Sequence, residues 1–237
     1  MLNNSAIKVS QLIKTVTTQE GELTILKGIN MDVKHGESVA ILGPSGSGKS
    51  TLLGLLAALD SPSEGEISLD GVSLVGLDEE QKAALRKQKI SFIFQSFMLV
   101  DTLTALENVM LPAELAGIKD ARTKAEQMLN RVGLAHRLGH LPKQLSGGEQ
   151  QRVAIARAFI AEPKVLFADE PTGNLDKHNA DRVADMLFTM NRESATTLVL
   201  VTHDLQLAKR CQRQLEMADG QLFEQAVQQE VSGWNGN

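Results

Sequence analysis

Aromatic residues and cysteines are scarce in this chain. It has no tyrosine, one tryptophan and seven phenylalanines among 237 residues. Its single cysteine, Cys211, excludes an intrachain disulfide and agrees with a reducing compartment. No apolar run approaches the ~20 residues that a membrane-spanning helix needs, and the N-terminus lacks the features of a secretory signal. If the protein works at a membrane, we expect another chain to supply the membrane part.

Long basic runs are also missing, and the formal net charge is −5. This charge argues against a surface built for nucleic-acid phosphates, although it leaves a local basic groove open. The remaining composition, with 42% hydrophobic and 22% charged residues, is ordinary for a globular protein. No repeat or linker divides the chain, so we expect a single domain over residues 1–237. The polar segment 226–237 is expected to fray.

The most informative stretch is a glycine-rich loop between a predicted strand (38–42) and a predicted leucine-rich helix (52–59). In that context the pattern G-x-x-x-x-G-K-[ST] indicates a phosphate-binding loop rather than a plain turn. Glycines let successive N–H groups form an anion nest, and the helix N-terminus adds a positive dipole end. Lys49 would reach the β- and γ-phosphates, and Ser50 would ligate Mg²⁺. The loop comprises Gly43, Pro44, Ser45, Gly46, Ser47, Gly48, Lys49, Ser50 and Thr51.

Predicted strands alternate with predicted helices along the rest of the chain, which indicates an α/β fold with a largely parallel sheet. Before the loop, residues 7–13 and 22–33 predict a small antiparallel sheet. A helical insertion is expected between about 97 and 145, broken near Pro112 and again at 117–120. Ligands bind parallel sheets at the carboxyl ends of the strands. Four candidate site residues follow predicted strands there: Gly43, Gln95, Asp169 and His203.

Two adjacent carboxylates, Asp169 and Glu170, end a predicted buried strand. Beside a phosphate loop, an acidic residue in this position is the expected partner of Mg²⁺, so Asp169 would hold the ion through water. Glu170 would point toward the γ-phosphate and act as general base on the attacking water. A solvated acidic turn is the alternative interpretation.

A second glycine-rich loop, with the sequence LSGGEQQR over residues 145–152, opens another predicted helix. It is a further candidate anion site, yet one chain with one nucleotide does not need two such sites. The loop resembles the signature sequence of ATP-binding cassette (ABC) ATPases. The resemblance extends over residues 7–223, with every motif in the order of that family.

This resemblance implies a P-loop NTPase (RecA-like) core with an N-terminal antiparallel subdomain and an inserted helical subdomain. It also implies a head-to-tail homodimer that sandwiches two ATP molecules between the phosphate loop of one chain and the signature of the other. In that arrangement Ser146 and Gly148 would contact the γ-phosphate in trans. Gln95, in the Q-loop position, would touch Mg²⁺ and the water, and His203, in the switch position, would hold the γ-phosphate and help position Glu170.

The site residues that follow fall into three groups. The catalytic residues would be Glu170, His203, Gln95 and Lys49, and the ligands of Mg²⁺ would be Ser50, Gln95 and Asp169. Besides the phosphate loop, the nucleotide would be bound by Val16, Ser146, Gly147, Gly148, Glu149 and Asp176.

Residues 104–109 (TALENV) and 169–176 (DEPTGNLD) resemble the lipoprotein-release and macrolide-export ATPases, and 94–99 and 202–208 resemble one subgroup of them. The resemblance implies a separate permease with few transmembrane helices and a large periplasmic region. It implies no nucleic-acid partner and a place on the cytoplasmic face of a bacterial inner membrane. Residues 97–100 would lie near the permease or belong to the core.

Two other functions stay open at this point. The chain could be an ATP-gated clamp on nucleic acid or ribosomes, although it lacks the long coiled-coil insertion or the fused second domain of such proteins. It could also bind ATP and hardly hydrolyse it, against which the intact Glu170 and His203 argue.

One position departs from the family pattern. ABC domains usually stack an aromatic residue on adenine near the end of the first strand, where this chain has Val16. Base stacking on an aromatic ring contributes roughly 1–3 kcal/mol in other nucleic-acid sites. We therefore expect adenine to be held loosely or by apolar contacts alone.

Overall fold

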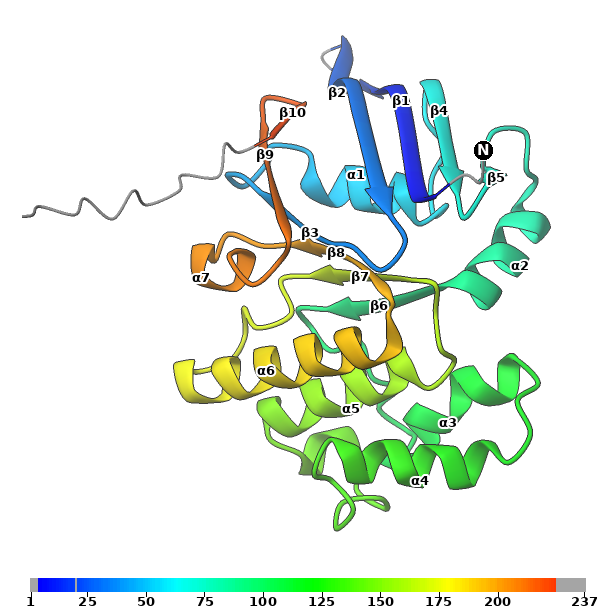
Figure 1. Ribbon diagram of the computed structural model, residues 1–237, viewed down its shortest axis with the longest axis vertical. Helices are drawn as coiled ribbons and strands as arrows, with labels where there is room; N and C mark the ends of the chain where they lie inside the picture. Colours follow the sequence, from blue (N-terminus) through cyan, green and yellow to red (C-terminus); the bar gives the residue numbers. More distant parts are fainter. Residues whose placement is uncertain (1–3, 20, 225–237) are drawn as a thin grey trace, which may run out of the picture.

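The computed structural model describes residues 4–19 and 21–224, which form two β-sheets with a group of helices packed below the larger one (Figure 1). The predicted fraying at 226–237 lies outside the described residues. The smaller sheet is antiparallel, with strand order β2-β1-β4-β5. Its strands are β1 (Ser5–Thr18), β2 (Gly21–Lys34), β4 (Glu64–Leu69) and β5 (Val72–Ser73). The antiparallel sheet expected before the phosphate loop is therefore present.

The larger sheet has the order β10-β9-β3-β8-β7-β6 and is parallel from β9 to β6. Only the pairing of β10 with β9 is antiparallel in the described part of this sheet. All the parallel strands therefore present their carboxyl ends at one edge. The strands are β3 (Ser38–Leu42), β6 (Ile90–Phe94), β7 (Val165–Asp169), β8 (Thr197–Val201), β9 (Arg213–Ala218) and β10 (Gln221–Glu224).

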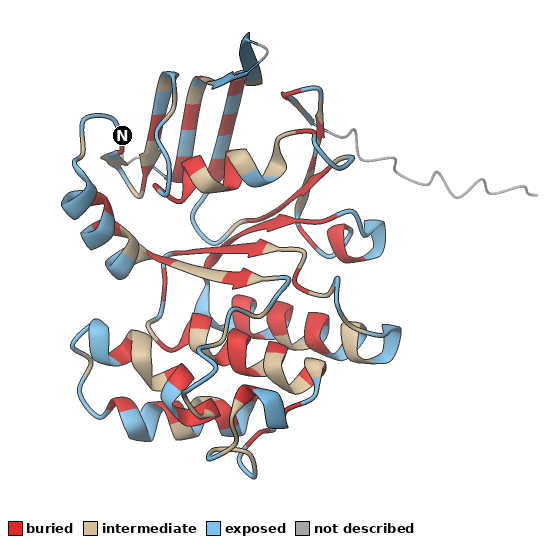
Figure 2. Cartoon of the chain, turned by 180° about the vertical axis from the view of Figure 1, so that it is seen from behind, coloured by how far each residue is buried: buried red, intermediate tan, exposed pale blue. Residues whose placement is uncertain are grey.

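Alternate side chains of the central strands feed two separate cores. Along β8, Leu198 and Leu200 join the core below the sheet, whereas Val199 and Val201 join the core above it. This alternation follows from the two-residue period of a strand. Helix α1 fills the space between the two sheets, and α5 and α6 cover the opposite face (Figure 1). Figure 2 shows the result, in which the central strands are buried while the outer helices are exposed along one side.

Helices α2, α3, α5 and α6 begin at residues whose side chains cap them. Asp78 accepts from the backbone N–H of Gln81, and the Gln81 side chain accepts from the N–H of Asp78 in return. Such reciprocal capping boxes satisfy the free amides of a first turn. The helices are α1 (Lys49–Leu56), α2 (Glu79–Lys89), α3 (Ala105–Leu115), α4 (Ala121–Arg131), the 3₁₀ turn η1 (Pro142–Gln144), α5 (Gly147–Phe159), α6 (Lys177–Ser194) and α7 (Leu205–Ala208).

The expected break at Pro112 is wrong, because α3 runs through this residue to Leu115. Proline removes one intrahelical hydrogen bond, but the helix has a capping box at Thr104 and buries Val109 and Ala113 completely. Burial of this face outweighs the lost bond. The second expected break, at 117–120, is present between α3 and α4. Within the described residues, no helix combines the length and apolar character needed to cross a bilayer.

Candidate active site

The phosphate-loop sequence leaves the buried strand β3 and enters α1, as its pattern predicts. Gly43 must be glycine, because a Cβ atom there would stand 2.2 Å from the backbone oxygen of Met217 in β9. Gly48 caps α1 with φ 104°, in the left-handed region that favours glycine. The close contact with β9 and the left-handed cap fix the loop at the carboxyl edge of the sheet.

The loop presents donors and no competing anion. Helix α1 has no acidic residue in its first turn and no side-chain cap, so its first amides are open to a ligand. The Lys49 ammonium lies across the loop and donates to the carbonyls of Gly43 and Pro44, each at 2.8 Å. The buried hydroxyl of Ser47 has no hydrogen-bond partner. An anion such as a phosphate group fits this set of donors.

Glu170, directly after β7, is held by three hydrogen bonds from the end of β8. The Thr202 hydroxyl donates to Oε2 at 3.0 Å, and His203 donates to Oε1 from its backbone N–H at 2.9 Å and from Nδ1 at 2.7 Å. Glu170 itself has φ 45°, a strained value for a residue with a side chain. Its carboxylate is thus aimed by contacts rather than free to rotate.

Asp169 is the last residue of β7 and is half-buried. Burial raises the pKa of Asp169, the neighbouring Glu170 carboxylate raises it further, and Lys49 opposes both. In the described residues, no group of three His, Cys, Asp or Glu side chains could hold a metal ion by itself. A magnesium ion fits such a site, because Mg²⁺ usually takes one or two carboxylates and completes its shell with water and substrate phosphates.

Gln95 follows β6 and is tied to the loop after Glu170. Its side-chain amide donates to Asn174 Oδ1 at 3.2 Å, and Asn174 Nδ2 donates to the Gln95 carbonyl at 2.9 Å. A Cβ atom at Gly173 would lie 2.9 Å from Gln95 Nε2.

Asp176 caps α6 by accepting a hydrogen bond from the backbone N–H of Asn179. The side-chain and backbone hydrogen bonds from Asn179 lower the pKa of Asp176.

The signature residues form the first turn of α5. Ser146 is the N-cap, and its Oγ accepts from the Glu149 N–H at 3.3 Å, while Glu149 Oε2 accepts from the Ser146 N–H at 2.8 Å. Gly148 lies against α6, where a Cβ atom would stand 2.9 Å from Asn179 Oδ1. In the described part of the chain, no hydrogen bond joins this turn to the phosphate loop. The two candidate anion sites of one chain are thus separate.

Val16 is half-buried on β1 and pairs with Leu23 of β2. Directly opposite residues of an antiparallel pair share one face of the sheet. Leu23 is largely exposed, and Ile25, two residues farther along β2, approaches Gly48 of the phosphate loop. The strand pair therefore carries an aliphatic surface near the loop.

Several contacts in the site could not be read from sequence motifs. Thr202 was missed, although a threonine directly before His203 at a strand end is a usable signal. Gln151, which is fully buried, donates to the Pro171 carbonyl at 2.6 Å. Arg157 of α5 donates to the carbonyls of Phe97, at 2.8 Å, and Met98. The contacts of Gln151 and Arg157 join residues distant in sequence and have no local pattern.

Comparison with known proteins gives a consistent picture. The family model described as "ABC transporter" matches residues 26–173. The ABC transporter ATP-binding protein YbbA of Escherichia coli K12 is 57% identical over 222 residues, covering 93% of this chain and 97% of that protein. The lipoprotein-releasing system ATP-binding protein LolD of Legionella pneumophila strain Paris is 46% identical, covering 94% and 99%.

Among solved structures, the dimeric ATP-binding cassette MJ0796, in a post-hydrolysis state bound to ADP and Pi, superposes with a TM-score of 0.84. It is 40% identical, covering 91% of this chain and 96% of that chain. The predicted fold class and the resemblance drawn from the motifs are both confirmed. With the phosphate loop, the signature turn and Glu170 arranged as described, the chain belongs to the ABC transporter family and has the ABC ATPase fold.

Proposed function

We propose that this protein is the ATP-hydrolysing subunit of a bacterial ABC transporter and that ATP drives it into a head-to-tail homodimer. The single observation that carries the proposal is the Glu170 carboxylate, fixed by Thr202 and His203 beside Asp169 at the edge that holds the phosphate loop. The related MJ0796 cassette, a dimer with ADP and Pi bound, supports both hydrolysis and dimerisation.

The catalytic role proposed for Glu170 follows from its hydrogen bonds. A carboxylate offers about four acceptor positions, and Thr202 and His203 occupy three of them. The remaining position can accept a hydrogen bond from water and then its proton. A general base aimed in this way typically contributes about 10²- to 10⁴-fold in rate.

The other roles concern binding and charge. Lys49 and the amides of the phosphate loop stabilise the charge that develops on the transferred phosphoryl group. Ser50, Gln95 and Asp169 are the proposed ligands of Mg²⁺. When bound, Mg²⁺ supplies positive charge to the phosphate oxygens. His203 orients Glu170 through its Nδ1–H.

The dimer is supported by the separation of the two candidate anion sites. The signature turn presents the Ser146 hydroxyl and the amides of Gly147 and Gly148, yet no described hydrogen bond links it to the phosphate loop of its own chain. A second copy in head-to-tail orientation would bring each signature turn to the phosphate loop of its partner. We also propose that residues 1–237 act as one domain with a helical subdomain over about 97–145.

A membrane permease is the second proposed partner, docking on the segment 97–100. Met98 and Val100 are 59% and 41% exposed, and Phe97 and Met98 have the strained φ values 59° and 50°. The structure thus holds apolar side chains outward, which suits an apolar partner surface.

We propose that the permease has few membrane helices and a large periplasmic region, and that this chain sits on the cytoplasmic face of the inner membrane. We propose lipoproteins, lipids or hydrophobic compounds as cargo, and the name of the relative LolD, a lipoprotein-releasing system ATP-binding protein, supports the first of these. The nucleic-acid clamp is not favoured.

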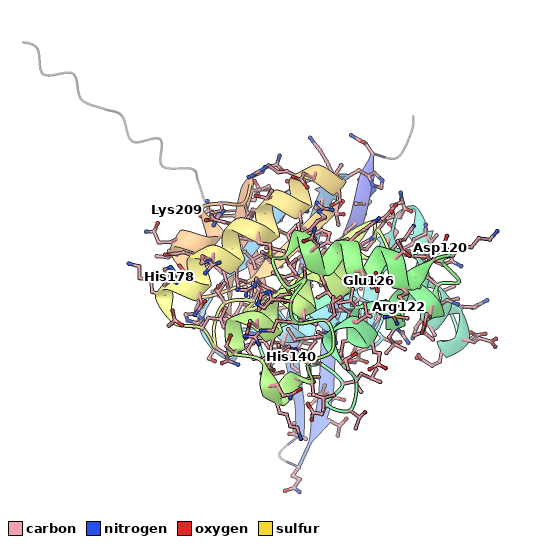
Figure 3. The ribbon with its side chains drawn as sticks, turned by 90° about the horizontal axis from the view of Figure 1, so that it is seen from below. Asp120, Arg122, Glu126, His140, His178 and Lys209 are labelled. Carbon is pink, nitrogen blue, oxygen red and sulfur yellow. The ribbon has the colours of Figure 1, made fainter. Side chains whose placement is uncertain are left out.

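The test is Glu170→Gln, which keeps the shape of the side chain and removes the base. We expect ATP binding to persist, phosphate release to fall about 10²-fold or more, and an ATP-bound dimer to accumulate in light scattering. The matched control is Glu126→Gln on α4, where Glu126 pairs with Arg122 on the outside of the helix (Figure 3). Normal hydrolysis by Glu170→Gln would refute the proposal.

A further inference from the structure

Glu149 places a carboxylate at the edge of a turn that has to receive a phosphate. It is the third residue of α5, and its side chain is only 14% exposed. A negative charge in the same turn as the amides of Gly147 and Gly148 opposes the approach of another anion, more strongly where water is partly excluded. Glutamine would complete the same capping box without this charge. The glutamate therefore needs a compensating partner.

Arg137 is that partner. It lies in the segment between α4 and η1, and its Nε donates to Glu149 Oε1 at 2.9 Å. Its Nη1 lies 3.1 Å from Nε2 of His140, which must accept because a guanidinium has no acceptor. Figure 3 labels His140 in this part of the helical region. The histidine contact holds the guanidinium from a second side.

The two oxygens of Glu149 have separate partners. Oε1 accepts from Arg137, and Oε2 accepts from the Ser146 N–H. The Ser146 N–H lowers the pKa of Glu149 most, and Arg137 lowers it further, so the group is a carboxylate at neutral pH. The orientation of the Glu149 carboxylate is thereby fixed at both of its oxygens.

This geometry also sets the hydroxyl of Ser146. Ser146 Oγ accepts from the Glu149 N–H, so a lone pair is used and the hydroxyl proton stays available to a ligand. If Glu149 turned away, the capping box would open and the hydroxyl would lose this orientation.

We propose that Arg137 is a positioning residue for the ATP-dependent dimer. It neutralises Glu149 and holds it on the Ser146 N–H, so that the first turn of α5 can receive the γ-phosphate bound by the partner chain. The inference rests on the proposed function, because it assumes that the signature turn acts in trans.

The experiment measures dimerisation in the Glu170→Gln parent by light scattering against ATP concentration. Adding Arg137→Met should raise the ATP concentration for half-maximal dimer about tenfold or more, as expected for loss of a hydrogen bond between charged groups. Adding Glu149→Gln alone should lower this concentration, because it removes the carboxylate that opposes the phosphate and leaves the Arg137 guanidinium without its counter-charge. The combination of Arg137→Met with Glu149→Gln should return close to the parent, because no charge is then left to neutralise.

Three further measurements separate positioning from a structural defect. ADP lacks the γ-phosphate, so its affinity, measured by calorimetry, should be the same in all variants. Arg131→Met, which breaks the Arg131–Glu193 ion pair in the same helical region, should dimerise like the parent. Arg137→Lys keeps the charge without the fixed fork and should fall between the parent and Arg137→Met.

The outcomes distinguish the two proposals. If the parent itself does not dimerise with ATP, the proposed function fails and the inference falls with it. If the parent dimerises but Arg137→Met matches it, the inference alone is overturned. The inference is also overturned if adding Glu149→Gln does not restore dimerisation to Arg137→Met. It is overturned as well if Arg137→Met and Arg137→Lys both lose the fold.

Discussion

Replacing Thr202 by valine tests how Glu170 is aimed without touching Glu170 itself. Thr202 is fully buried, and its hydroxyl donates to Glu170 Oε2 while accepting from the Asp204 N–H, both at 3.0 Å. Valine has nearly the same shape but cannot make either bond. Hydrogen bonds to charged groups contribute about 1.5–3 kcal/mol, which corresponds to roughly a 10- to 100-fold change. Because His203 still holds Oε1, we expect kcat to fall within that range while the KM for ATP changes little.

The matched control for this variant lies at the opposite end of the same strand. Thr196, just before β8, is also buried and donates to the Pro163 carbonyl at 3.1 Å, away from the candidate site. Thr196→Val should lose a comparable amount of stability in thermal unfolding and keep its rate of phosphate release. Equal kcat values for Thr202→Val and Thr196→Val would refute the role given to Thr202.

Two more outcomes can be measured on the isolated protein. Val16→Tyr should lower the Kd for ATP by roughly 5- to 150-fold, since stacking on adenine is worth roughly 1–3 kcal/mol; an unchanged Kd in calorimetry would place adenine elsewhere. Burial raises the pKa of the Cys211 thiol to about 12, so its thiolate fraction at pH 8 is on the order of 10⁻⁴ and the thiolate is the reactive form. Ellman's reagent should therefore label native protein very slowly and guanidinium-unfolded protein quickly, whereas rapid native labelling would show Cys211 to be accessible.

The parts of this site that the sequence predicts are those built from neighbouring residues. The phosphate loop needs only a glycine-rich turn between a strand and a helix, and 43–51 contains all of it. The carboxylates 169–170 follow directly from an apolar run that ends in two acids. In each case the backbone geometry is local, so spacing along the chain is sufficient.

The partners of these residues could not be predicted in the same way, because they depend on strand order. Asp169 pairs with Val201 in the register of β7 and β8, and that register alone brings Thr202 next to Glu170. Arg137, Gln151 and Arg157 likewise act on residues from other elements. The predicted helix break at Pro112 was wrong for a related reason, because burial of α3 in the tertiary structure outweighed the local preference of proline.

The loop 171–176 joins the two halves of the proposed dimer site within one chain. The loop starts at Pro171, the residue after Glu170. The Pro171 carbonyl accepts a hydrogen bond from the side chain of Gln151 on α5. At its end, Asp176 caps α6 through Asn179, the residue on which Gly148 lies. Glu170 would act on the nucleotide bound by its own chain, whereas α5 would serve the nucleotide of the partner. In the proposed dimer, a shift of Glu170 would reach α5 through the buried contact of Gln151 with Pro171, and α6 through the exposed contact of Asp176 with Asn179, so the two nucleotide sites would be coupled.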